Sequence, residues 1–213
     1  MKLTTVLIFG AMALTSGQAL AGRKSVNIWK GRFPRANCSR NECAKNVPAA
    51  ALDAALDKIT YVRPKMLKKK YMFVADFTQH SKNKRGYLIN IKTGKSVAYH
   101  VAHGKNSGNG RGNTVRFSNT NQSKMSSKGL YLAAETYSGK HGFSMRMDGL
   151  EHTNSRARRR AIVLHGADYM SPSYIKRNGR SGRSWGCPAV ARNLTKSLIN
   201  KIKGGSAYYI HGN

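Results

Sequence analysis

The sequence is poor in acidic residues. Only eight of its 213 residues are Asp or Glu, against 38 Lys or Arg, and the formal net charge is +30. A charge this positive indicates anionic surroundings. The scarcity of carboxylates also argues against glycoside cleavage, which needs two of them across the sugar bond. The nearest candidate pair, Asp148 and Glu151, lies in a glycine-containing turn beside arginines, so we expect ion pairing there.

Long apolar stretches are absent beyond the N-terminus. Lys2 precedes a mostly apolar run at residues 3–14, and the small-residue cleavage site Ala-Leu-Ala follows at 19–21, so residues 1–21 are expected to be a secretory signal peptide. The run is short for a membrane span, which makes a retained anchor the lesser alternative. We expect an exported protein, periplasmic or in the cell envelope, with no stable membrane span. Export removes nucleic acid as a partner and leaves anionic envelope polymers.

Cysteine is scarce as well, with three residues in the whole chain. Cys38 and Cys43 lie five positions apart in a loop-like segment, and in an oxidising compartment we expect them to form a disulfide. Half of a metal site is the alternative, but no Cys or His cluster lies nearby to complete it, so we expect no metal. Cys187 is then left over. An odd thiol in an exported protein is a candidate reactive group, the alternative being an inert buried cysteine.

The order of the patterns predicts a mainly β domain with a few helices. After the signal peptide, residues 22–65 form a basic segment with one helix at 49–59, and residues 66–213 form the main domain. Helical spacing is also expected at 154–160 and 188–202, and the Gly-, Asn- and Ser-rich residues 104–128 indicate a long functional loop. Apolar, β-prone runs predict strands at 71–77, 87–91, 96–101, 129–137, 143–147, 161–164 and 207–210.

Two segments have the residues for nucleophilic catalysis. An apolar strand ends on His165, and a glycine-containing turn ends on Cys187, just before a helix expected to begin at Pro188. A helix N-terminus lowers the pKa of a thiol and favours the thiolate. A neighbouring histidine would act as the base, and the N–H groups of Gly186 and Cys187 would face the oxygen of a tetrahedral intermediate. The polar loop 167–186 is long enough to bring the histidine and the cysteine together.

The pattern His-Gly…Ser-x-Gly-Cys, formed here by residues 165–166 and 184–187, resembles the YkuD-type L,D-transpeptidases. The fuller segment Gly-Arg-Ser-Trp-Gly-Cys-Pro-Ala at 182–189 resembles their second subfamily, the murein L,D-transpeptidase catalytic domain family. The resemblance spans residues 70–211 and implies a YkuD-like mixed β-sandwich catalytic domain. It includes further motifs at 103–108, 117–119, 126–129 and 148–151.

The resemblance also implies a mechanism and a set of site residues. Cys187 would attack the carbonyl between meso-diaminopimelate and the terminal D-Ala of a peptidoglycan stem peptide, forming a thioester that an amine of a second stem resolves. His165 would be the base, with its ring oriented by the backbone carbonyl of Gly166. No metal or other cofactor is implied. The residues expected to bind substrate or the oxyanion are His103, Ser118, Arg183, Ser184, Trp185 and Gly186.

One position departs from the YkuD pattern, because Trp185 stands where a second histidine is usual. Hydrolysis by an L,D-carboxypeptidase, or the action of another murein cysteine peptidase, is therefore an alternative to transpeptidation. A non-catalytic cationic envelope-binding protein is the alternative from another class, although the intact His165 and Cys187 argue against it. His141 and His152 flank an expected strand, and we expect neither to have a catalytic role.

Overall fold

The computed structural model describes residues 44, 46–61 and 70–213, so Cys38, Cys43 and the expected signal peptide lie outside the described residues. Within this part of the chain, eight strands and three helices confirm the mainly β expectation. The helices are α2 (Ala49–Tyr61), α3 (Pro172–Asn178) and α4 (Arg192–Ile202), with short 3-10 turns η2 (Lys105–Ser107) and η3 (Asp168–Met170). The strands are β1 (Tyr71–Asp76), β2 (Gly86–Asn90), β3 (Ser96–Tyr99), β4 (Gly129–Gly139), β5 (Gly142–Gly149), β6 (Val163–Ala167), β7 (Ala189–Ala191) and β8 (Ser206–His211).

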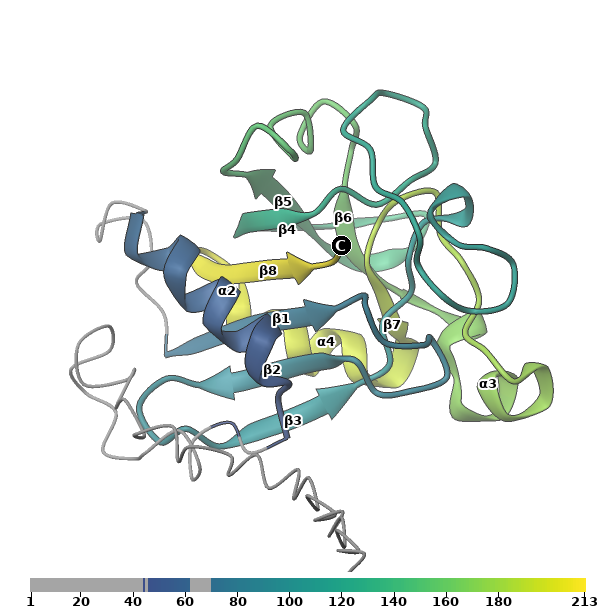
Figure 1. The fold of residues 1–213 in the computed structure, drawn as a ribbon, viewed down its shortest axis with the longest axis horizontal. Helices are drawn as coiled ribbons and strands as arrows, with labels where there is room; N and C mark the ends of the chain where they lie inside the picture. Colours follow the sequence, from purple (N-terminus) through teal and green to yellow (C-terminus); the bar gives the residue numbers. More distant parts are fainter. Residues whose placement is uncertain (1–43, 45, 62–69) are drawn as a thin grey trace, which may run out of the picture.

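The strands form one mixed sheet in the order β3-β2-β1-β8-β4-β5-β6-β7. The pairs β1–β8 and β6–β7 are parallel, and the other neighbours are antiparallel. In Figure 1, β6 and β7 run steeply across the direction of β8 and β1, so the sheet bends strongly towards that end. The parallel pair β6–β7 lies at one end of the sheet, and it brings β6 close to the residues that precede β7 in the chain.

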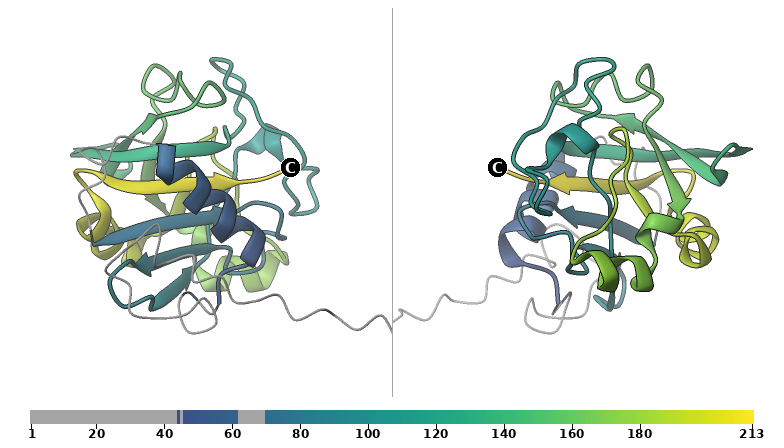
Figure 2. Two further views of the ribbon diagram at one scale, coloured as in Figure 1. Left: turned by 60° about the vertical axis from the view of Figure 1, so that its left-hand side comes forward. Right: turned by 90° about the vertical axis from the view of Figure 1, so that its right-hand side faces the viewer.

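Both faces of the sheet are covered by a helix. Along β1, Phe73 and Ala75 belong to the core cluster that includes α4, whereas Met72 and Val74 belong to the cluster that includes α2. Figure 2 shows these two helices on opposite sides of the sheet. Burial on both faces explains why β1 is an unbroken apolar run. It also means that α2, which the sequence analysis assigned to a separate segment at 22–65, packs into the same core as the strands.

Three local predictions are wrong. Residues 154–160 form successive turns, because Asn154 turns its buried side chain to the carbonyl of Leu130 and to the N–H of Glu151. The supposed loop 167–186 contains α3, which begins after Ser171, whose hydroxyl accepts from the N–H of Tyr174. The helix expected from Pro188 begins only at Arg192, since residues 189–191 pair with β6 instead.

Candidate active site

The parallel pairing of β6 with β7 brings the candidate histidine and cysteine to one place. His165 in β6 lies opposite Ala189 in β7, and Cys187 stands two residues before that partner. The backbone N–H of His165 donates to the carbonyl of Pro188 at 3.4 Å. The chain between residues 167 and 186 therefore folds back and places the cysteine turn alongside the histidine strand.

The imidazole of His165 is buried and bound by the next residue in the chain. Its Nδ1 lies 3.1 Å from the carbonyl oxygen of Gly166, and because a carbonyl only accepts, we assign the ring proton to Nδ1. Burial lowers the pKa of His165; the Gly166 hydrogen bond opposes this effect, and the charges of His141 and Arg192 add to it. The ring is therefore neutral at pH 7, and its Nε2 makes no hydrogen bond to a described residue.

The backbone of the cysteine turn is fixed by a serine and a glycine. Ser184 is buried, and its hydroxyl donates to the carbonyl of Cys187 at 2.5 Å and accepts from the N–H of Gly186 at 3.0 Å. Gly186 has a φ of +124°, and a Cβ there would lie 2.7 Å from the carbonyl oxygen of Met125. Glycine meets both requirements. The Ser-x-Gly-Cys spacing thus reflects a turn that holds the main chain of the cysteine.

The thiol of Cys187 is in a different environment from the one that the sequence predicts. Because β7 separates Cys187 from α4, the sulfur does not stand at the start of that helix, and the pKa argument from the helix dipole is wrong. Burial raises the pKa of Cys187, while a backbone hydrogen bond from Val163 and the charges of Arg160 and Lys140 oppose the rise. The sulfur lies 3.6 Å from the carbonyl oxygen of Ala161. At pH 7 these shifts give a protonated thiol and a neutral imidazole.

The cysteine turn also decides which of the two expected oxyanion donors is free to bind a substrate oxygen. The N–H of Gly186 already donates to Ser184, so it is not free to bind a second acceptor. The N–H of Cys187 makes no hydrogen bond to the described residues. Of the two backbone donors that the sequence proposed, Cys187 is the one that the turn leaves available.

Comparison with known families identifies the domain. A family model described as the L,D-transpeptidase catalytic domain matches residues 43–211. The chain belongs to this family. The resemblance drawn from the sequence motifs is thereby confirmed, and the matched range includes α2. Comparison with curated proteins found no match.

Several solved structures resemble the chain remotely. An L,D-transpeptidase from Mycobacterium tuberculosis H37Rv is 13% identical over 67% of this chain and 58% of its own, with a TM-score of 0.43. L,D-transpeptidase 3 from the same species, solved with a faropenem-derived adduct, is 12% identical over 67% and 60%, also at 0.43. Bd1075 of Bdellovibrio bacteriovorus is 15% identical over 67% and 48%, at 0.42. The match thus spans about half to three fifths of these solved chains.

The prediction that His103 contacts substrate in this L,D-transpeptidase domain is wrong. His103 is only 1% exposed, and its Nδ1 accepts from the guanidinium of Arg85 at 2.7 Å. Burial, with the charges of Arg85, Arg183 and Arg180, lowers the pKa of His103 to about 3, so the ring is neutral. Its surroundings give it a structural role, because the fully buried Arg85 also donates twice to the carbonyl of Val101.

The other expected contacts lie around the cysteine turn in different settings. Trp185 is 72% exposed, and the ammonium of Lys124 lies 4.9 Å from the centre of its ring. Ser118 is half-buried, and its N–H donates to the carbonyl of Ser126 at 3.0 Å. Arg183, which directly precedes Ser184, lines a cleft. The loop 104–128, predicted to be functional, reaches the turn through Ser126, whose hydroxyl donates to the carbonyl of Gly186 at 3.2 Å.

Arg160 lies at the site, although the sequence analysis did not single it out. Its guanidinium donates to the carbonyls of Ser118 and Met125, at 2.8 and 2.5 Å, and to the hydroxyls of Ser123 and Ser127. Its charge also lowers the pKa of Cys187. One side chain therefore both fixes the wall of the site and favours negative charge on the sulfur.

His141 is a second residue that the sequence analysis missed. It lies in the turn between β4 and β5, and its ring stacks on that of His165, with the centroids 4.4 Å apart and the planes inclined by 27°. Burial lowers the pKa of His141, and the charges of Lys140 and Arg192 lower it further. A partly exposed imidazole thus covers the buried one. The sequence analysis expected no catalytic role for His141 and did not anticipate this contact with His165.

Asp148 and Glu151 serve as ion-pair partners, as predicted. Asp148 accepts from Arg158 at 2.5 and 2.7 Å, and Glu151 pairs with Lys58 at 2.9 Å. Among the described residues, no group of three His, Cys, Asp or Glu side chains could hold a metal ion. No described helix is long and apolar enough to cross a membrane.

Proposed function

We propose that this domain uses Cys187 as its nucleophile and His165 as its base on peptidoglycan stem peptides, through a thioester acyl-enzyme. The main support is the pairing of β6 with β7, which sets the cysteine turn beside a histidine whose Nδ1 is bound by Gly166. Nε2 is the ring atom left for the thiol proton. The imidazole is neutral at pH 7, and that form can accept a proton.

The acylation step starts from a protonated thiol. As Sγ attacks the carbonyl carbon between diaminopimelate and D-Ala, the thiol proton passes to Nε2 of His165 and the carbonyl oxygen becomes an oxyanion. The N–H of Cys187, which has no partner among the described residues, would stabilise that oxygen. The charge of Arg160 favours the thiolate as it forms. The imidazolium then gives its proton to the leaving amine, the C–N bond breaks, D-Ala departs and the thioester remains.

Deacylation runs the same groups in the opposite sense. An amine of a second stem attacks the thioester, His165 takes the amine proton, and Sγ leaves as the thiol is restored. Water in place of the amine would give an L,D-carboxypeptidase. Position 185 holds an exposed tryptophan and not a histidine, so the choice between amine and water is a separate question from the identity of the nucleophile.

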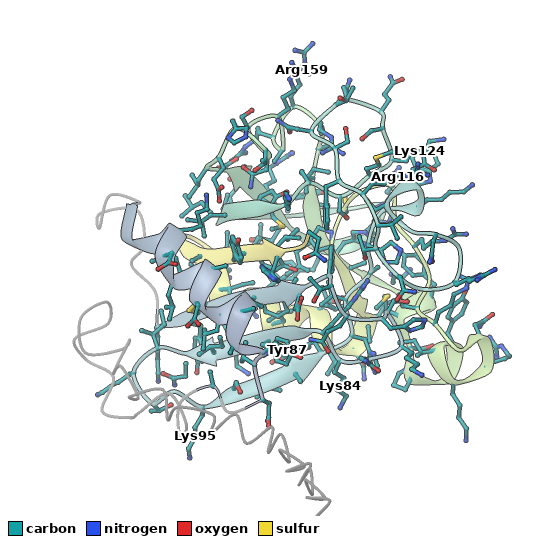
Figure 3. The ribbon with its side chains drawn as sticks, viewed as in Figure 1. Lys84, Tyr87, Lys95, Arg116, Lys124 and Arg159 are labelled. Carbon is teal, nitrogen blue, oxygen red and sulfur yellow. The ribbon has the colours of Figure 1, made fainter. Side chains whose placement is uncertain are left out.

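We place this activity outside the cytoplasm, where the stem peptides are found and where a net charge of +30 would favour contact with anionic envelope polymers. The basic side chains labelled in Figure 3 project from opposite edges of the domain, with Arg159 and Lys124 at one edge and Lys95 at another. Positive charge is thus distributed over the surface. This distribution favours loose adsorption to an anionic polymer.

The test is incubation of the full protein with a disaccharide-tetrapeptide and mass spectrometry of the products. Wild type, Cys187→Ala and His165→Ala are compared, with circular dichroism to verify folding. Release of D-Ala with crosslinked dimers, lost in both variants, supports the transpeptidase. Release without dimers indicates the carboxypeptidase. Turnover that survives in Cys187→Ala contradicts the proposed nucleophile, and absence of turnover in wild type favours the non-catalytic cationic envelope-binding protein.

A further inference from the structure

A cationic cleft opens beside the cysteine turn. Its volume is about 230 Å³, below the range of about 300–1,000 Å³ that is usual for sites enclosing a whole drug-sized ligand. A cleft of this size suits the end group of a larger substrate. The residues that line it are Lys105, Tyr169, Tyr174, Arg180, Gly182 and Arg183.

The positive charges of the cleft have no negative counterpart. Lys105, Arg180 and Arg183 form no ion pair with any carboxylate in the described part of the chain. By contrast, Arg158 and Arg192 are each paired with acidic residues. Three cations that converge on one concave surface repel one another, and a bound anion relieves that repulsion. Two tyrosine hydroxyls at the same surface add neutral hydrogen-bond donors.

Residues that line the cleft are connected to the turn that carries Cys187. The N–H of Gly182 donates to the carbonyl of Tyr169 at 2.9 Å, and a Cβ on Gly182 would lie 2.5 Å from the Cβ of Tyr169. Burial raises the pKa of Tyr169 to about 12, and the nearby charge of Cys187 contributes to the rise. On the other wall, the N–H of Lys105 donates to the carbonyl of Ser184 at 2.7 Å, and Ser184 fixes the cysteine turn.

We propose that this cleft binds the free carboxylate of the amino acid that leaves the donor stem. The inference rests on the proposed function, in which the bond cleaved lies one residue before a terminal carboxylate. That carboxylate must therefore lie close to the cysteine turn, beside which the cleft opens. Guanidinium groups match a carboxylate with two parallel hydrogen bonds, and Arg180 and Arg183 supply two such groups. The cleft makes the enzyme an exopeptidyl transferase, selective for donors that end at this position.

The experiment compares two donor tetrapeptides, one with the natural terminal carboxylate and one with a terminal carboxamide. For Arg180→Gln and Arg183→Gln we expect KM for the carboxylate donor to rise roughly 10- to 100-fold, the usual effect of losing a hydrogen bond to a charged group. KM for the carboxamide donor should change little in these variants. Lys95→Gln removes the same charge at a distant edge of the domain (Figure 3) and should leave both values unchanged.

Binding to the inactive protein separates this inference from the proposed function. Calorimetry with Cys187→Ala, with and without Arg180→Gln, measures the affinity for both peptides whether or not turnover occurs. Tighter binding of the carboxylate peptide, reduced by Arg180→Gln to the level of the carboxamide peptide, supports the cleft even if no catalysis is seen. Equal affinity for the two peptides, or equal weakening of both by the substitution, overturns it.

Discussion

Replacing Ser184 with alanine tests how the cysteine turn is held. The hydroxyl of Ser184 bridges the turn, since it donates to the carbonyl of Cys187 at 2.5 Å and accepts from the N–H of Gly186 at 3.0 Å. Both Ser184 and Gly186 are buried, so water does not readily replace the lost contacts. Ser184→Ala therefore leaves one buried donor and one acceptor without a partner, directly at the candidate nucleophile.

The size of the effect follows from these two contacts. A buried polar group left unsatisfied costs about 1–3 kcal/mol, so the loss of two partners should lower the free energy of unfolding by about 2–6 kcal/mol. For a domain of this size that corresponds to a fall in Tm of roughly 4–24 °C. The catalytic effect should be larger than the loss of stability suggests. A displacement of about 1 Å at a nucleophile can reduce the rate about 100-fold.

The matched control is Ser181→Ala, a buried serine three residues earlier whose hydroxyl donates once, to the carbonyl of Gly182 at 3.0 Å. It should cost about 1 kcal/mol and leave the rate of D-Ala release nearly unchanged. Both variants are measured by thermal unfolding and, well below Tm, by mass spectrometry of D-Ala release. If Ser184→Ala retains the wild-type rate, or if Ser181→Ala lowers it equally, the reasoning about the turn is refuted.

Three further predictions concern the same site. Gly186→Ala should lower the free energy of unfolding by about 1–3 kcal/mol because of the φ of +124°, and by a further amount because the new Cβ would contact Met125. We expect a large fall in Tm and no D-Ala release. A variant with the wild-type Tm would contradict this geometry. Because the pKa of Cys187 is raised, iodoacetamide alkylation of the thiol should be slow at pH 7 and accelerate about tenfold per pH unit up to a midpoint above that of an ordinary thiol, whereas fast alkylation at pH 6 would indicate a preformed thiolate. His141→Ala uncovers His165 and removes a neighbouring charge, so the pKa of His165 should rise and the acid limb of the pH–rate profile should move to higher pH; an unchanged limb would show that the stacked ring is inert.

The fold was largely predictable, because strands with covered faces leave simple patterns. The strands predicted at residues 71–77, 87–91 and 96–101 correspond closely to β1, β2 and β3. The exception is instructive. Residues 189–191 continue the apolar spacing of a helix, yet they form β7 because β6 offers a parallel partner that is distant in sequence. A preference decided by such a partner is not visible in local spacing.

The site was predictable only where its residues are close in sequence. The histidine strand and the cysteine turn each have a local pattern, so His165 and Cys187 could be proposed directly. Arg160 and His141 reach the site from a series of turns and from a hairpin turn, and their roles depend on contacts with segments elsewhere in the chain. Conversely, His103 has the sequence setting of a loop residue, and only its contact with Arg85 reveals that it is buried.

The most direct test of the central claim is to trap the acyl-enzyme. The wild-type protein is mixed briefly with disaccharide-tetrapeptide and quenched in acid, and its intact mass and peptide map are measured. We predict an added disaccharide-tripeptide on Cys187, removable by hydroxylamine, together with an equivalent of D-Ala. D-Ala release without any adduct on Cys187, or an adduct that also forms in Cys187→Ala, would contradict a thioester mechanism at this residue.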